Sequence, residues 1–170
     1  MKNPKEEEVK IKNCDNTSVG MFIWKEDKLL LIERKKFPFG FAVPAGHVDN
    51  HGSFEDAAKE EVEEEVGLTV TKLKLIKEGR RENVCRRPGG AWHYWKVYET
   101  EVTGDLNPSQ DETKKAGWYT KDEIGNLAKK TEAYNNNEIS KADWEQSPGL
   151  EPNFYEMLKE LNLILPLKSV

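Results

Sequence analysis

One stretch, residues 45–68, constrains the fold more than any other because it contains the beginning, the inner face and the end of a helix. At about 100° per residue, 53–66 carries an apolar stripe that would face a core. Its members are Phe54, Ala58, Val62 and Val66. Ser53 is an N-cap residue with Asp56 three positions later, and Gly67 stands where a left-handed residue ends a helix. The sequence therefore predicts a packed helix over 53–66.

This helix carries acid on its inner side as well as on its outer side. Glu65 falls within about 20° of Ala58, and Glu61 lies about 40° further round. Glu61, Glu64 and Glu65 stand at i, i+3 and i+4, which brings their oxygens together over one turn. Such a cluster, with no histidine or cysteine beside it, suits a hard divalent cation, Mg²⁺ or Mn²⁺. A solvated acidic face without a ligand is the alternative.

The spacing of these residues resembles the Nudix box, the signature of the Nudix hydrolase family. The matching positions are Gly46, Glu61, Val62, Glu64, Glu65, Gly67 and Leu68. Two positions depart from the box, because Gly52 stands where the pattern has a glutamate and Glu60 where it has an arginine. An arginine would pair with Glu64 one turn on, whereas Glu60 adds a like charge. The resemblance therefore implies metal binding more directly than full catalytic competence.

The resemblance also implies a fold and a reaction. The fold is the Nudix α/β/α sandwich with a central mixed sheet, where the pattern of elements alone gives only α/β or α+β. The reaction is hydrolysis of a phosphoanhydride bond in a nucleoside diphosphate linked to another group. Glu61, Glu64 and Glu65 would bind Mg²⁺ or Mn²⁺ with the Gly46 carbonyl, and Glu61 or Glu64 would activate the water. Glu112 stands where many family members carry another acid, as a ligand or base. Since the metal keeps these acids ionised, activity should rise towards alkaline pH.

Further strands and helices are predicted on both sides of this helix. The strands are 18–24, 28–33, 41–48, 69–78, 91–102 and 117–119. Thr120 and Glu123 form a second capping box, which begins a helix towards Ala128, and Pro152 begins a C-terminal helix with an apolar face. Residues 79–90 are a predicted basic loop or hairpin, and 130–150 have no assigned structure. Residues 1–13 are polar and expected to be loosely ordered, and 1–170 form a single domain.

Composition excludes several classes of function. The chain has 170 residues, a net charge of −5 and 34% charged residues. Binding to nucleic acid or an anionic membrane through long-range attraction is therefore not expected. No apolar run has the length of a membrane span, the N-terminus lacks the apolar core of a signal peptide, and two cysteines do not make a disulfide framework. We expect a cytoplasmic protein.

Substrate recognition is less strongly indicated. Arg80, Arg81 and Trp92 are the candidates for binding the phosphates and base of the substrate, with Arg86 and Arg87 in the same stretch. The alternative is that these side chains are solvated loop charges and part of the sheet core. Aromatic residues on an edge strand leave a homodimer as an alternative to a monomer.

The two cysteines and two of the three histidines raise a separate question. Cys14, His47, Cys85 and His93 would form a zinc site if the fold gathered them. Their spacings contain no CxxC or HxxxH pattern, so free thiols and ordinary histidines are the favoured interpretation.

Two alternatives to an active hydrolase follow from the departures and the cysteines. Gly52 and Glu60 favour a Nudix fold that binds a nucleotide without cleaving it. A diphosphate isomerase acting on isoprenoids would need a reactive cysteine and an acid near the metal, and neither Cys14 nor Cys85 has such a context in the sequence.

Overall fold

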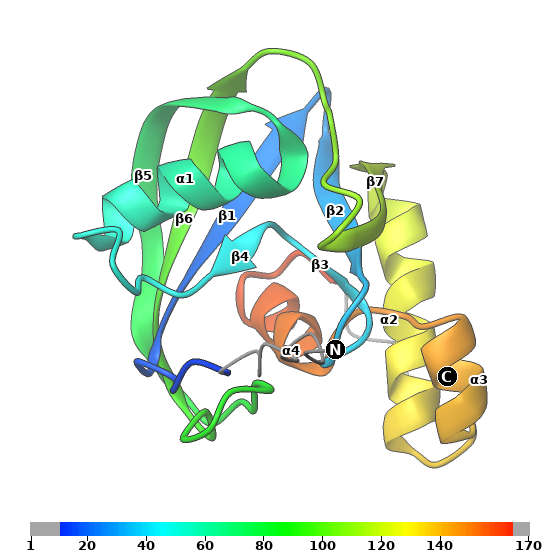
Figure 1. The fold of residues 1–170 in the computed structure, drawn as a ribbon. Helices are drawn as coiled ribbons and strands as arrows, with labels where there is room; N and C mark the ends of the chain where they lie inside the picture. The colour runs from blue at the N-terminus through cyan, green and yellow to red at the C-terminus, as the bar shows by residue number, and fades with distance from the viewer. Residues whose placement is uncertain (1–10, 165–170) are drawn as a thin grey trace, which may run out of the picture.

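The computed structural model describes residues 11–164, and expectations for 1–10 lie outside the described residues. Four helices and seven strands follow one another along this part of the chain (Figure 1). They are β1 (Thr17–Lys25), β2 (Lys28–Arg34), β3 (Phe41–Ala42), β4 (Ala45–Gly46), α1 (Phe54–Val66), β5 (Thr69–Arg81), β6 (His93–Thr103), β7 (Thr113–Tyr119), α2 (Lys121–Asn135), α3 (Lys141–Gln146) and α4 (Pro152–Glu160). No helix in this part is long and apolar enough to cross a membrane.

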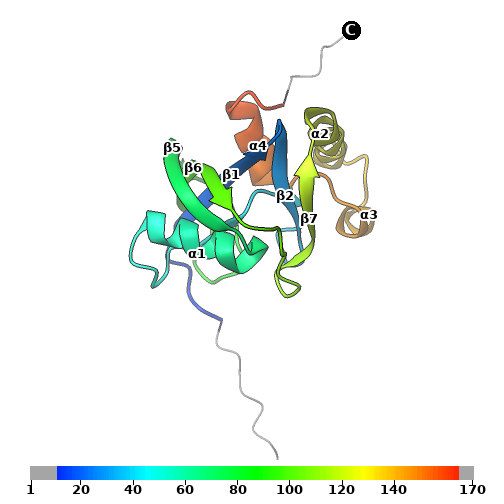
Figure 2. The ribbon, with the colours of Figure 1, turned by 90° about the horizontal axis from the view of Figure 1, so that it is seen from above.

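The seven strands form one mixed sheet in the order β3-β2-β1-β6-β5, with β4 paired to β1 and β7 paired to β2. β1 and β6 run parallel, and the other pairs are antiparallel. Figure 2 shows α1 on one side of the sheet and α2 and α4 on the other. The arrangement is the predicted α/β/α sandwich.

β1 lies at the centre of the sheet, and its side chains are therefore buried on both faces. Val19, Met21 and Ile23 pack towards α1, in a core cluster that includes Val62. Phe22 points the other way and belongs to the cluster formed with α2 and α4. Successive side chains of β1 point to opposite faces of the sheet and therefore belong to two separate cores. The predicted helix over 53–66 packs on the first of these cores.

The predicted helix over 53–66 is confirmed as α1, together with both of its caps. The Ser53 side chain accepts a hydrogen bond from Asp56 N at 3.0 Å. Gly67 has φ 71° and its N–H donates to Glu63 O at 3.0 Å. Only glycine takes this left-handed conformation without a steric penalty. The buried residues of the helix are Ala57, Ala58, Val62, Glu65 and Val66.

The single strand predicted over 41–48 is wrong, since β3 and β4 are separate two-residue strands with different partners. Pro44 lies between them and has no N–H for a sheet ladder, although its carbonyl accepts from Met21 N at 2.9 Å. The chain leaves β2 at this point and pairs with β1, where Gly46 stands opposite Val19. This change of partner brings Gly46 to the centre of the sheet.

Three further boundaries differ from the prediction. β5 continues to Arg81 in its ladder with β6, so the predicted loop over 79–90 begins only after Arg81. β7 begins at Thr113 because it pairs along β2 as far as Arg34. Helices α2 and α3 occupy much of 130–150, where Thr131 is buried on α2 and donates to Leu150 O at 2.9 Å. Because Thr131 is a polar residue on the inner face of α2, the apolar periodicity expected of a packed helix is interrupted there.

Candidate active site

The five residues predicted to hold the metal line one cavity of about 410 Å³. They are Gly46, Glu61, Glu64, Glu65 and Glu112. β4 supplies the glycine, α1 the three glutamates, and the turn before β7 the last acid. The glycine and the carboxylates therefore come from three segments and meet at one cavity.

Gly46 is required by the close approach of α1 to β4. A Cβ atom at position 46 would overlap the carboxyl group of Glu61. Any side chain there would displace that carboxylate, so the glycine allows backbone and acid to face the same point. A carbonyl and a carboxylate on one side of a cavity are suitable oxygen ligands for a hard cation.

The cavity holds two buried acids whose charges are poorly compensated. Glu65 is 5% exposed, and its Oε2 has no hydrogen-bond partner among the described residues. Burial, followed by the charge of Glu61, raises the pKa of Glu65 well above its usual range. Burial and the charge of Glu64 raise the pKa of Glu61 to about 7. Glu112 adds to both shifts, while Arg34 opposes that of Glu65.

This electrostatic arrangement fits a divalent cation. Ionised carboxylates crowded in a buried site repel one another, and a doubly charged ion removes that cost while satisfying the free Glu65 oxygen. Glu64 is the exposed member of the three helix acids. The residues present therefore match Mg²⁺ or Mn²⁺, which prefer oxygen ligands.

The two departures from the Nudix box are explained by a local contact between the loop and the helix. Gly52 has φ 98°, so the loop turns into α1 through a left-handed conformation. The preceding residue, His51, contacts the Glu60 carboxylate through Nδ1, and its Nε2 lies 3.6 Å from Glu61 Oε1. The loop thus places a histidine against Glu60, the acid that stands where the box has an arginine.

Basic side chains lie on the same cavity as the acids. Arg34, Arg86 and Arg87 are among its lining residues. Arg87 donates to both Asp49 oxygens, at 2.8 and 3.0 Å, and this pairing lowers the pKa of Asp49 and raises that of Arg87. Arg34 Nε donates to Pro38 O at 2.7 Å. In the sequence Arg34 begins a run of three basic residues, and such a run carries no information about depth in a cavity.

The residues predicted to bind substrate lie outside the carboxylate cavity, although Arg80 and Arg81 line a second, larger cavity. Arg80, Arg81 and Trp92 do not line the carboxylate cavity of the described chain. Arg81 binds α4, donating to Asn153 Oδ1 at 2.8 Å and Glu160 Oε2 at 2.6 Å. The guanidinium of Arg80 stacks 4.2 Å from the Trp92 ring centre. Because β5 extends through both arginines, their side chains follow the strand and not a mobile loop. Their role in substrate binding stays a prediction.

A second cavity of about 700 Å³ adjoins the first. Phe37, Pro38, Asn83 and Val84 belong to the walls of both cavities. The larger one also has aromatic walls from Phe39, Tyr134 and Trp144. A polar chamber with carboxylates therefore opens next to a chamber with aromatic side chains.

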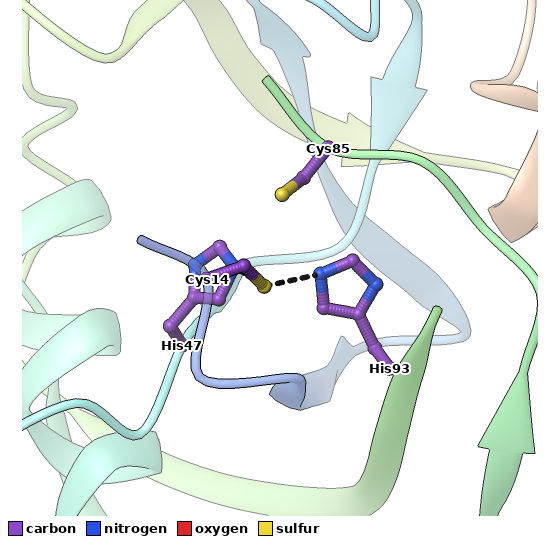
Figure 3. Close-up of side chains that lie close together, drawn as sticks. All are labelled: Cys14, His47, Cys85 and His93. Atoms are coloured by element: carbon purple, nitrogen blue, oxygen red, sulfur yellow. Dashed lines mark hydrogen bonds between the residues drawn. The ribbon is translucent and has the colours of Figure 1, made fainter. Parts of the chain in front are cut away.

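Both cysteines are free thiols, as expected, but the fold brings them together with two histidines. One ligand atom from each of Cys14, His47, Cys85 and His93 lies within 4.8 Å of the other three (Figure 3). Burial lowers the pKa of His47 to about 4 and also lowers that of His93, so both rings are neutral at neutral pH. No spacing motif in the sequence indicates this cluster, because its four residues come from four separate segments.

Comparison with known proteins agrees with the fold and the motif. A model of the NUDIX domain matches residues 15–142. An ADP-ribose pyrophosphatase from Methanocaldococcus jannaschii is 33% identical over 114 residues, which are 65% of this chain and 65% of that protein. The matched part therefore spans just under two thirds of that relative.

Solved structures agree as well. A MutT NUDIX hydrolase from Burkholderia pseudomallei has a TM-score of 0.57 and 25% identity, over 64% of this chain and 84% of that one. A NUDIX family hydrolase from Clostridium perfringens shares the fold, with a TM-score of 0.59 and 22% identity over 85% of this chain and 94% of that one. Since the family model covers most of the chain, and the box residues line one acidic cavity, the protein belongs to the Nudix hydrolase family.

Proposed function

We propose that the protein is a pyrophosphohydrolase, dependent on Mg²⁺ or Mn²⁺, that cleaves a phosphoanhydride bond in a nucleoside diphosphate joined to another group. The observation that carries this proposal is the cavity lined by buried Glu65, half-buried Glu61 and Gly46, together with Glu64 and Glu112. The relative named as an ADP-ribose pyrophosphatase supports a substrate of this class.

Different residues of the chain have different roles in this reaction. A bound Mg²⁺ or Mn²⁺ supplies charge for the diphosphate oxygens and lowers the pKa of a water molecule. Glu65 and Glu61 are the ligands we assign to the ion, since burial holds both carboxylates in one orientation. Glu64 is exposed towards the cavity and takes the proton of the attacking water at a carboxylate oxygen. Arg34 lines the same cavity and is the side chain we assign to the phosphate oxygens.

The two adjoining cavities suggest how a substrate of this class lies. We place the diphosphate in the carboxylate cavity and the nucleoside in the aromatic one, where Phe37 stands at the junction. A base stacks well on aromatic faces, and a diphosphate needs the charged walls. ADP-ribose is therefore the first compound to test, beside NADH, dinucleoside polyphosphates and nucleoside triphosphates.

The test is release of nucleotide products from this panel with Mg²⁺ or Mn²⁺, with chelator as the blank. We expect metal-dependent turnover of one substrate class and a fall of about two orders of magnitude in kcat for Glu64→Gln. Glu63→Gln is the matched control, since Glu63 is an exposed acid on the same helix and does not line the cavity. An unchanged rate in Glu64→Gln would remove the assignment of the base.

Binding without cleavage is the second candidate, and the observation that favours it is that Gly52 and Glu60 stand where the box has a glutamate and an arginine. In that case one compound of the panel would raise the melting temperature while no product formed. Restoring the box with the double change Gly52→Glu and Glu60→Arg would then bring turnover back. Turnover by the unaltered chain would exclude this candidate.

A further inference from the structure

We propose that Cys14, His47, Cys85 and His93 form a structural zinc site with ligands other than the carboxylates, although His47, Cys85 and His93 line the same cavity. The four ligand atoms lie within 4.8 Å of one another, and their side chains point towards one centre (Figure 3). Cys14 Sγ lies 3.5 Å from His47 Nε2 and 3.2 Å from His93 Nε2. Around a tetrahedral zinc ion, sulfur and nitrogen ligands are about 3.6 Å apart, from the usual Zn–S and Zn–N bond lengths. The spacing therefore already matches a metal centre.

The sheet itself gathers these residues. β1 pairs with β6 from Thr17 opposite Tyr94, so Cys14 just before one strand lies beside His93 at the start of the other. β4 pairs with β1 at Gly46, which places the next residue, His47, on the same side. Cys85 comes from the loop between β5 and β6. Four protein ligands leave no position for a substrate, which is typical of structural zinc sites.

Contacts around the cluster orient its ligand atoms. His93 Nδ1 lies 3.0 Å from Asn83 O, and since a carbonyl only accepts, Nδ1 donates and Nε2 keeps its lone pair for a metal. Asn16 N donates to Cys14 Sγ at 3.3 Å, and Arg87 N donates to Cys85 Sγ at 3.4 Å. Each cysteine sulfur thus accepts a hydrogen bond from the amide N–H of the residue two positions later, which orients it towards the centre of the cluster.

The loop of Cys85 is folded around its sulfur. Cys85 N donates to Gly90 O at 2.8 Å, and Cys14 N donates to Pro88 O at 2.9 Å. A Cβ atom at Gly90 would overlap Cys85 Sγ, so glycine is needed where the loop closes over the cluster. The site would therefore join the segment before β1 to the loop between β5 and β6.

The location gives the proposed ion a role. Asn83 and Arg86, from the same loop, line the carboxylate cavity. An ion held by Cys85 and three partners outside the loop would fix these residues next to the substrate. We therefore assign to zinc the positioning of the substrate loop, with no part in the chemistry of the reaction.

The donor set selects the metal. Two thiolates and two imidazoles in tetrahedral arrangement favour zinc, whereas carboxylates and a carbonyl favour Mg²⁺ or Mn²⁺. The chain would thus sort two metals by ligand chemistry in neighbouring sites. The chemistry requires reduced thiols, which is the state expected in the cytoplasm.

The first test is the metal content of tag-free protein, purified under reducing conditions without added metal. Mass spectrometry of the metals should give about one zinc per chain, which remains after a short EDTA wash that strips Mg²⁺ and Mn²⁺. Replacement by Co²⁺ should give the visible absorption of a tetrahedral cobalt thiolate. Reduced protein that contains no zinc and takes up none would overturn the proposal, as would a Cys14–Cys85 disulfide in freshly lysed cells.

Variants separate this site from the catalytic one. Cys85→Ser should lose the bound zinc and raise KM more than it lowers kcat, while Cys85→His should keep zinc. Glu64→Gln is the matched control, because it should keep zinc while losing turnover. Zinc retained by Cys85→Ser and by Cys14→Ser would contradict the assignment. If the serine variants do not fold, the zinc content and cobalt spectrum of the unaltered chain decide, and both are independent of any substrate.

Discussion

The carboxylate cavity and the cysteine–histidine cluster adjoin one another, yet they differ in how the chain builds them. Three acids of the cavity come from one turn of α1, so their proximity is a property of a helix. The cluster takes its four members from four segments, and only the pairing of β1 with β4 and β6 brings them together. The cavity is wide and open to a substrate, whereas the ligand atoms of the cluster are within 4.8 Å of one another. A catalytic metal needs a free coordination position, and a structural one does not.

The largest expected effect is a loss of turnover in Gly46→Ala, which should leave the zinc site unchanged. In Gly46→Ala the new Cβ overlaps the Glu61 carboxyl group, so turnover should fall by about 100-fold. The zinc content should not change. Gly125→Ala on α2 is the control, since nothing lies within 4 Å of a Cβ there. Steady-state kinetics beside metal analysis measures both effects, and equal loss of zinc and turnover would show that the two sites are not independent.

Removal of zinc should lower the free energy of unfolding, because the ion is proposed to have no part in the reaction. A ligand that binds only the folded chain, at a concentration about 100 times its Kd, contributes about 2.7 kcal/mol to the free energy of unfolding. Denaturant unfolding of zinc-loaded protein against protein stripped with a strong chelator under reducing conditions should show a loss of this order. Readdition of Mg²⁺ should not restore it. Equal stability of the two forms would mean that the cluster carries no structural ion.

The binding of Mn²⁺ in the carboxylate cavity should depend on pH through Glu61. Since the pKa of Glu61 is about 7 in the folded protein, Mn²⁺ must displace a proton below that pH, and its affinity should fall by up to about tenfold per pH unit. An acid with a raised pKa favours the folded chain at low pH, so metal-free protein should lose stability as pH rises from about 4.5 to about 7. Melting temperatures with and without Mn²⁺ at pH 5.5 and pH 8.5 test both signs. A larger Mn²⁺ effect at the lower pH would contradict the assignment of Glu61.

The smallest expected effect tests the helix that carries the acids. Ser53→Ala removes the bond to Asp56 N and should cost about 1 kcal/mol of unfolding free energy. Ser140→Ala removes the matching cap of α3, which lies away from both sites, and provides the control. If capping also orients the acids, Ser53→Ala alone should weaken Mn²⁺ binding. Equal Mn²⁺ affinity in both variants would limit the role of the cap to stability.

Much of the cavity could be predicted because its parts are local. A helix of 3.6 residues per turn fixes the relative places of Glu61, Glu64 and Glu65, and caps at Ser53 and Gly67 define its ends. The break between β3 and β4 at Pro44 and the extension of β5 to Arg81 were not predicted. Both depend on which neighbouring strand offers hydrogen bonds, and that partner is distant in sequence.

The amino-acid sequence alone determined the capped helix, its three acids, the Nudix resemblance and the type of cation that suits them, because short-range geometry and ligand chemistry are written in consecutive residues. Only the tertiary structure decided that Glu65 is buried with a raised pKa, that Arg81 is bound to α4, and that two cysteines meet two histidines. The reason is physical. Burial and long-range contact depend on the packing of the whole sheet, and four single residues have no common period along the chain.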